Sequence, residues 1–289
     1  MPLRAHYEHA QRVAQTLAVA KRCRYIVKAM QIVELRDKVR IETFLRLNPE
    51  LHVYSLGDLD DLFWPATTWY GGQEAGALRE IVLVYAGRGL PTVVALSEDP
   101  AAVQKLLRKV VPRLPDRFYA HLSPGIPQIF KRTHRVASHG PHRKMSLRNA
   151  GQVRAIDCSA AVLLTESDRD DLVRLYDESY PGNWFDPQML ETRQYFGLRV
   201  ARRLVSVAGV HVYSEQYRVA AIGNVVTHPD HRNRGYGTLV TGRLCQSLLE
   251  TTDHIGLNVK ADNAPARACY TRLGFEIVAS YGEFTIEKK

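Results

Sequence analysis

The sequence predicts an α/β protein made of two halves, each with a central sheet flanked by helices. Three observations support this fold class. Strand-like and helix-like runs alternate along most of the 289 residues. A strand-like run over 219–226 enters a glycine-containing loop, and a helix-like run leaves it. The order of elements expected for 30–150 is repeated over 151–289, which suggests a diverged duplication.

The first half, residues 30–150, is expected to begin with a strand and to follow a basic extension, residues 1–29. Met30 is a candidate natural start of the folded part. The expected elements are strand 30–35, helix 36–47, hairpin strands 80–86 and 91–96, helix 100–111, strand 118–122 and short helix 126–131.

The second half, residues 151–289, follows a boundary segment placed at 144–155. Its helix after the glycine loop has Val240, Leu244 and Leu248 on one stripe. The other expected elements are strands 160–164, 196–200, 204–213, 219–226, 254–259, 275–279 and 284–287, and helices 168–180, 189–195 and 264–273.

Composition excludes several classes of protein. Hydrophobic residues make up 45% and charged residues 24%, as in globular domains, and no apolar run approaches membrane-spanning length. We therefore expect a cytoplasmic protein with no membrane partner. The net charge of +9 suits nucleic acid or a polyanionic cofactor. No nucleic-acid motif accompanies it, so we do not expect nucleic acid. The four cysteines are scattered and predict free thiols: Cys23, Cys158, Cys245 and Cys269.

The loop over 227–238 is the strongest candidate for a binding site. Gly235 and Gly237 permit positive φ and leave backbone N–H groups uncovered where a helix begins. The first N–H groups of a helix have no partner within it, so they can bind a phosphate. Arg232 and Arg234 add positive charge. A tight turn without a ligand is the alternative interpretation, and neither a Walker loop nor a dinucleotide fingerprint fits the spacing.

Two motifs in the right order give this region a family resemblance. The first has the spacing Arg232-x-x-Gly235-x-Gly237. The second includes Asn263, Ala266, Tyr270, Gly274 and Phe275. Together they resemble the motifs of the GNAT superfamily of N-acetyltransferases, over roughly 161–289. The layout, with a degenerate first half and a competent second half, is also similar to glycine N-acyltransferase-like proteins.

The resemblance implies the acyl-CoA N-acyltransferase fold, with mostly antiparallel sheets, and acetyl-CoA as co-substrate. It places the pantetheine arm on the backbone of Val225, Val226 and Thr227, with the Val225 N–H facing the thioester oxygen. Tyr270 would act as general acid beside the CoA sulfur. The residues implied to hold the pyrophosphate are Arg232, Asn233, Arg234, Gly235, Tyr236, Gly237 and Thr238. Asn263 and Ala266 complete the implied cofactor site.

The sequence departs from the family pattern at the usual general base. Many members carry a glutamate eleven residues before the first position of the loop motif, where this chain has Ala221. Glu215, His211 and His228 are the remaining candidates. The missing glutamate argues against transfer to glycine.

Other clusters have weaker functional interpretations. The aromatic loop 180–187 is a candidate wall of the acceptor pocket or, alternatively, a lid over the core. Asp58, Asp60 and Asp61 are read as a solvated turn in preference to a metal site. His134, His139 and His142 are not expected to bind metal. Segment 97–100 has acids where the second half has glycines, so the first half should not bind CoA and should instead close over the acceptor.

The sequence therefore predicts an N-acyltransferase, most simply an N-acetyltransferase. It would act on a primary amine of a small molecule or peptide, as a monomer or homodimer. The alternative is a non-catalytic acyl-CoA sensor, which Ala221 favours and Tyr270 disfavours. No metal is expected.

Overall fold

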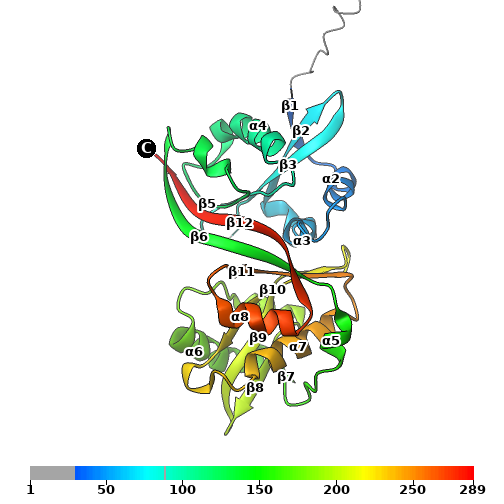
Figure 1. The fold of residues 1–289 in the computed structure, drawn as a ribbon, viewed down its shortest axis with the longest axis vertical. Coiled ribbons are helices and arrows are strands. Elements are labelled where there is room, and N and C mark those ends of the chain that lie inside the picture. The colour runs from blue at the N-terminus through cyan, green and yellow to red at the C-terminus, as the bar shows by residue number, and fades with distance from the viewer. Residues whose placement is uncertain (1–29, 88) are drawn as a thin grey trace, which may run out of the picture.

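A computed structural model describes residues 30–87 and 89–289; the predicted extension 1–29 lies outside the described residues. One twelve-stranded sheet runs through both halves (Figure 1), in the order β1-β2-β3-β4-β5-β12-β6-β11-β10-β9-β8-β7. Only two neighbouring pairs are parallel, β4 with β5 and β10 with β11. The predicted mixed, mostly antiparallel α/β fold is confirmed.

The strands are β1 (Gln31–Leu35), β2 (Thr67–Glu74), β3 (Ala77–Tyr85), β4 (Thr92–Ala95), β5 (Arg117–Leu122), β6 (His134–Leu147), β7 (Val162–Leu163), β8 (Phe196–Val200), β9 (Arg203–Ser214), β10 (Val219–Thr227), β11 (His254–Lys260) and β12 (Phe275–Lys288). The helices are α2 (Lys38–Leu45), α3 (Val53–Gly57), α4 (Pro100–Val110), α5 (Ala150–Arg154), α6 (Arg169–Ser179), α7 (Tyr236–Leu248) and α8 (Ala264–Arg272). The 3₁₀ turns are η1 (Trp64–Ala66), η2 (Val111–Arg113), η3 (Ile126–Ile129), η4 (Glu166–Asp168), η5 (Pro187–Thr192) and η6 (Pro229–His231).

The two halves exchange their last strands. β6 ends the first half but pairs with β11 of the second half. β12 ends the second half, yet residues 282–287 pair with β5 of the first half. The two long strands also pair with each other, and Figure 1 shows them running side by side between the halves. The predicted boundary near residue 150 is therefore crossed by β12, although "first half" and "second half" remain useful names for 30–150 and 151–289.

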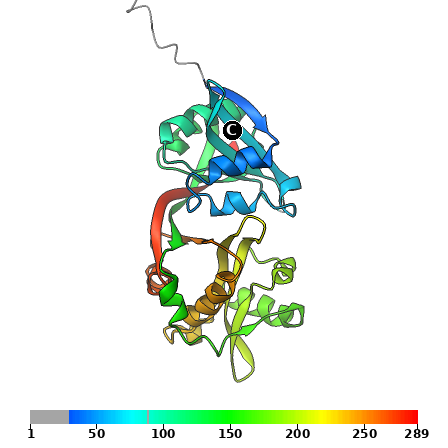
Figure 2. The same ribbon diagram turned by 90° about the vertical axis from the view of Figure 1, so that its right-hand side faces the viewer.

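A shared core also joins the halves. α2 and α3 of the first half pack into one hydrophobic cluster with Val212, Val219 and Ala221 of the second half. Figure 2 shows these blue helices directly above the yellow β9–β10 hairpin. Gly57 of α3 allows the close approach, because a Cβ there would meet the Val212 side chain at 2.0 Å. One face of the sheet around β10 is thus covered by the first half.

β2, like β6, is a strand that the sequence analysis missed. Gly71 and Gly72 interrupt its pattern of β-forming side chains, and glycine is depleted in strands. Both glycines are buried and allow neighbouring side chains to approach closely. A Cβ on Gly71 would meet Leu35 at 2.9 Å, and one on Gly72 would meet the Met30 sulfur at 2.8 Å. These glycines are needed for packing and do not mark a loop.

Four predicted boundaries were wrong. The histidine segment and the start of the predicted boundary, 144–147, belong to β6, which tolerates Pro141 within its length. The two predicted C-terminal strands, 275–279 and 284–287, are one strand, β12. The helix expected over 189–195 is the 3₁₀ turn η5. The short helix expected over 126–131 is the 3₁₀ turn η3. No element was predicted for the segment that forms α3. The other predicted strands and helices of the second half are present with ends shifted by a few residues.

In the part of the chain that the structure describes, no helix is long and apolar enough to cross a membrane. Cys158, Cys245 and Cys269 are free thiols, as predicted, and Cys23 lies outside the described residues.

Candidate functional site

The site begins where β10 and β11 separate. The two parallel strands pair only over 219–222 of β10 and 254–257 of β11. β10 continues for five residues to Thr227, and β11 turns its other edge to β6. The backbone of β10 beyond Ile222 therefore has no register partner in β11. A free strand edge of this kind can bind an extended ligand through its backbone.

A bulge in β10 lies at the point of separation. Asn224 and Val225 together oppose only Ala208 of β9, because the register passes from Gly223–Gly209 directly to Val226–Val207. Asn224 has a φ of +53°, which asparagine tolerates better than most residues. This places Val225, the predicted oxyanion-binding residue, immediately after the bulged position.

Side chains of the second half hold this bulge in place. The Asn224 amide donates to the Tyr195 hydroxyl at 2.9 Å, and its Oδ1 lies 3.1 Å from His211 Nε2. The Tyr176 hydroxyl donates to the Asn224 carbonyl at 2.8 Å. Tyr176 and Tyr195 are almost fully buried. The sequence analysis did not identify Asn224, and the only available signal was an asparagine inside a strand of apolar residues.

The loop after β10 leads into α7 without a side-chain cap. Gly235 is the N-cap residue with a φ of +80°, and no side chain caps this end of the helix. The first helical hydrogen bond runs from the Leu239 N–H to the Gly235 carbonyl at 3.0 Å. The N–H groups of Tyr236, Gly237 and Thr238 precede it and are the donors a phosphate would use.

The two predicted arginines flank this helix end and are exposed. Arg232 Nε donates to the Thr227 carbonyl at 3.2 Å, and an Arg234 nitrogen donates to the Asp230 carbonyl at 3.3 Å. Asn233 has a φ of +61°, so it helps the loop turn. The Tyr236 ring stacks on the His231 ring, with centroids 6.3 Å apart. The predicted pyrophosphate residues are therefore brought together at the start of α7.

The second motif lies beside the first. Thr238 of α7 donates to the Cys269 sulfur of α8 at 3.3 Å, which ties the two helix faces together. Asn263 caps α8 by accepting from the Ala266 N–H at 3.2 Å. Tyr270 is buried, with its ring 6.0 Å from Phe275. Burial raises the pKa of the Tyr270 hydroxyl above its usual range, so this group carries its proton at neutral pH.

Residue 221, where many GNAT proteins carry a glutamate base, is shielded from solvent. Ala221 is fully buried, and it packs in the cluster formed with α3. A carboxylate there would lose its hydration without a partner, so the alanine follows from the packing of the first half.

The three remaining base candidates have different surroundings. Glu215 lies in the exposed turn before β10 and accepts from the Tyr213 hydroxyl. His228 is held in the loop by the Asp230 N–H and Arg203, which agrees with a turn residue. His211 alone lies at the bulge, since a Cβ on Gly223 would meet its ring at 2.3 Å. Burial lowers the pKa of His211, so this imidazole is neutral at pH 7.

The weaker clusters have partners of their own. Asp61 pairs with Lys38 at the surface, and Asp60 accepts from the buried Ser214 hydroxyl of the second half, so these two carboxylates already have partners. The three histidines also make separate contacts: His134 with Thr133, His139 with Thr285, and His142 with Gly140.

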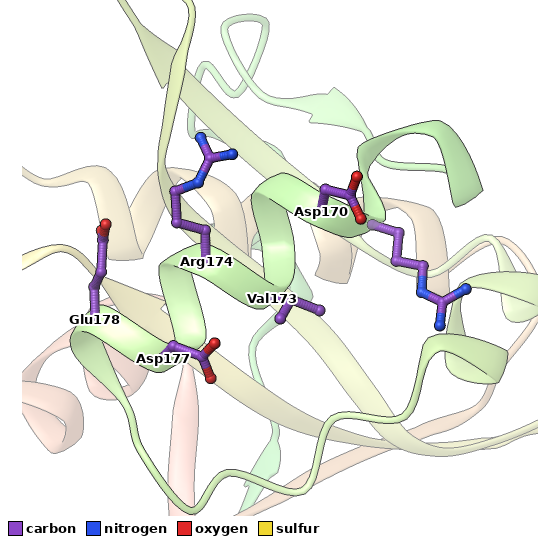
Figure 3. A pocket seen from close by; sticks show the side chains of 6 residues that line it. Asp170, Val173, Arg174, Asp177 and Glu178 are labelled. Carbon is purple, nitrogen blue, oxygen red and sulfur yellow. The ribbon is translucent and has the colours of Figure 1, made fainter.

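A shallow depression of about 500 Å³ lies along α6, and its Glu178 pairs with His228 of the loop after β10. Figure 3 shows its lining side chains projecting from α6 alone, among them Val173 and Asp177. No second element closes it, so we assign it no function.

Several known proteins resemble this chain in sequence or in fold. Residues 195–282 match the family model described as FR47-like protein. A Drosophila protein of solved structure is 11% identical over 88% of this chain and 98% of its own, with a TM-score of 0.66. A putative acetyltransferase of the GNAT family from Novosphingobium aromaticivorans is 20% identical over 72% of this chain and 88% of its own, with a TM-score of 0.53. A tandem GNAT protein from the clavulanic acid biosynthesis pathway is 17% identical over 89% and 98%, with a TM-score of 0.51. No curated protein matches the sequence.

Proposed function

We propose that this chain is an acyltransferase of the GNAT type with a tandem layout, and that it uses acyl-CoA. Its match to the FR47-like family model over 195–282 and its fold likeness to a tandem GNAT protein support this. The proposed acyl group is acetyl, the simplest one, and the proposed acceptor is a primary amine of a small molecule or peptide. The second half carries out the transfer, and the first half closes the acceptor side.

The observation that carries this proposal is the uncapped start of α7 at the end of a separated strand. The N–H groups of Tyr236, Gly237 and Thr238 and the helix dipole offer a site for the CoA pyrophosphate. Arg232 and Arg234 supply mobile charge at its edge. From there the free edge of β10 leads back to Val225, so an extended pantetheine arm would end at the bulge.

The residues at the bulge suit the chemistry of transfer. The acceptor nitrogen attacks the thioester carbonyl, and the Val225 N–H would stabilise the oxygen on which negative charge develops. When the C–S bond breaks, Tyr270 would give its proton to the CoA thiolate, since its hydroxyl is protonated at neutral pH. His211 and Asn224 position the bulge on which the oxyanion contact depends.

A second function, a non-catalytic acyl-CoA sensor, is favoured by one observation. Ala221 stands buried where many relatives of this fold carry a base. A positioned base contributes roughly 10²–10⁴-fold to rate, so its absence would suit a protein that only binds.

Release of free CoA from acetyl-CoA, measured with a panel of primary amines and peptide N-termini, separates the two functions. We expect amine-dependent release above the rate without protein. Tight binding of acetyl-CoA with no release across the panel would favour the sensor. Absence of acetyl-CoA binding would refute both.

A further inference from the structure

Glu283 lies where the exchanged strand β12 passes from the second half to the first. It is opposite His121 of β5 on one side and Gly140 of β6 on the other. The β12–β6 register shifts directly after it, between Glu283 and Phe284. Such bulges redirect side chains and are common next to active sites. The side chain is 14% exposed, so it is mostly enclosed but still accessible.

Aromatic hydroxyls and imidazoles surround this carboxylate. It accepts hydrogen bonds from the Tyr119 hydroxyl and, at 2.7 Å, from the Tyr281 hydroxyl. His142 Nε2 is 3.3 Å from one carboxylate oxygen, and His121 Nε2 is 3.6 Å from the other. Among residues 30–87 and 89–289, no lysine or arginine lies within ion-pair distance of Glu283.

The nearest buried cation is engaged elsewhere. Lys144 Nζ donates to Asn258 Oδ1 at 3.2 Å and lies 4.7 Å above the Tyr54 ring. Burial lowers the pKa of Lys144 to about 8. Lys144 interacts electrostatically with Glu283, but among the described residues it forms no ion pair with this carboxylate.

The Glu283 carboxylate is ionised at neutral pH. Burial opposes its ionisation, but the hydrogen bonds from Tyr119 and Tyr281 favour the carboxylate, and the pKa of Glu283 lies below its usual range. Burial lowers the pKa of His121 to about 4, so this imidazole is neutral. An ionised carboxylate without a lysine or arginine partner is suited to binding a cationic ligand.

The cluster is linked to the proposed transfer site through the sheet. His142, whose Nε2 lies 3.3 Å from Glu283, is opposite Lys260 of β11 in the β6–β11 register. β11 in turn pairs with β10 up to Ile222, where the two strands separate. In the sheet, β6 and β11 are thus the two strands between Glu283 and the bulge of β10.

An exposed aromatic rim lies next to Tyr119 of this cluster. Tyr180 and Trp184 belong to the predicted acceptor loop and are 43% and 54% exposed. The Trp184 ring is 6.3 Å from the Tyr119 ring, so this loop of the second half reaches the first half. Aromatic faces beside a carboxylate are the combination that binds organic ammonium groups.

We propose that Glu283 and the aromatic rim of Tyr180 and Trp184 bind the acceptor as a protonated primary amine with an apolar body. This inference rests on the proposed acyl transfer. The ammonium group loses one proton to solvent through the polar cluster, and the neutral nitrogen then forms the C–N bond. The second amine proton balances the one that Tyr270 gives to the departing thiolate. The negative charge that binds the acceptor thus comes from Glu283 on the exchanged strand β12. It does not come from residue 221, where the buried Ala221 replaces the usual glutamate.

Benzylamine and aniline provide the test, because they share a ring but only benzylamine is cationic at neutral pH. We expect the full chain to acetylate benzylamine, and Glu283→Gln to lower kcat/KM for it roughly 10- to 100-fold. Turnover of aniline should change much less, and acetyl-CoA binding should stay unchanged. Glu287→Gln, an exposed carboxylate on the same strand, is the matched control and should change neither amine.

Trp184→Ala keeps the test valid if Glu283→Gln does not fold, because Trp184 is exposed. It should lower kcat/KM for benzylamine about three- to fivefold. Equal losses for both amines in the variants, or a protein that acetylates aniline but no cationic amine, would overturn this inference. A protein that does not bind acetyl-CoA, or that binds it and acetylates no amine at all, would instead refute the proposed acyl transfer.

Discussion

The two halves differ most clearly at the helix that follows their parallel strand pair. In the first half, Asp99 caps α4 and accepts from the Ala101 and Ala102 N–H groups, both at 3.0 Å. Pro100 has no N–H to offer. In the second half, Gly235 stands at the same place before α7 and provides no side chain. The carboxylate of Asp99 thus already occupies in α4 the donors that α7 leaves for an external anion.

The parallel strand pairs of the two halves also differ, since the pair is closed in the first half and open in the second. β4 and β5 pair along the full length of β4, and the Ser123 N–H extends the contact to the Ala95 carbonyl. β10 and β11 separate after Ile222. A closed pair offers no free strand edge, and an occupied helix end offers no anion site. The comparison shows that the first half is closed at both places where the second half is open, as the proposed acyl-CoA site requires.

Ala221→Glu restores the family's usual carboxylate and should have the largest effect. The position is fully buried beneath α3, so we expect the free energy of unfolding to fall by roughly 3 kcal/mol or more, with no gain in activity. Urea unfolding measures this. Ala77→Glu, at an exposed strand position, is the control and should be nearly neutral. A stable, faster Ala221→Glu variant would mean that the first half does not close this face.

Gly237→Trp should weaken acetyl-CoA binding about 100-fold, roughly 2.7 kcal/mol. A Cβ at this position has room, with its nearest neighbour, Thr227 Oγ1, 3.5 Å away, so the fold should survive while the indole covers the helix N–H groups. Calorimetry gives the affinity. The matched change in the first half, Ala101→Trp, should leave affinity unaltered. Equal losses in both variants would contradict the assignment of binding to the second half.

Tyr270→Phe should lower kcat roughly 100-fold with little change in acetyl-CoA affinity, because it removes the proton donor for the thiolate. The ring would still pack against Phe275, so stability should be kept. Steady-state kinetics with a saturating amine tests this. Tyr70→Phe in the first half has the same exposed fraction, 8%, and should leave kcat unchanged. Wild-type turnover by Tyr270→Phe would remove its assigned role.

The smallest expected effect is the pH dependence of stability caused by Lys144, which lies on β6 where the two halves meet. Its pKa is about 8 in the folded protein, lowered by burial from 10.5. The unfolded chain therefore binds more protons between these values, and folding becomes more favourable as pH rises through them. Relative to Lys144→Met, the wild type should gain roughly 1–3 kcal/mol across that window. A flat difference in unfolding free energy would show that Lys144 is not desolvated.

The sequence predicted the elements that carry a strong local pattern. The loop from Thr227 to Thr238 and the helix before Gly274 were correct because glycine and periodic apolar residues mark them locally. β2 was missed because Gly71 and Gly72 are required by packing from distant residues. The strand exchange was not predictable from local pattern, since β6 and β12 alternate in the same way whichever half they join. Glu283 was missed for that reason, because only the exchange brings it to His121 and Tyr119.

Amide hydrogen exchange with and without acetyl-CoA tests the central claim most directly, since it reports both halves in one experiment. We predict slower exchange at residues 225–227 and 235–238 when acetyl-CoA is added, with no change at 97–102, where Asp99 caps α4. Unchanged exchange over 225–238, or protection at 97–102 instead, would contradict the assignment of the acyl-CoA site to the second half.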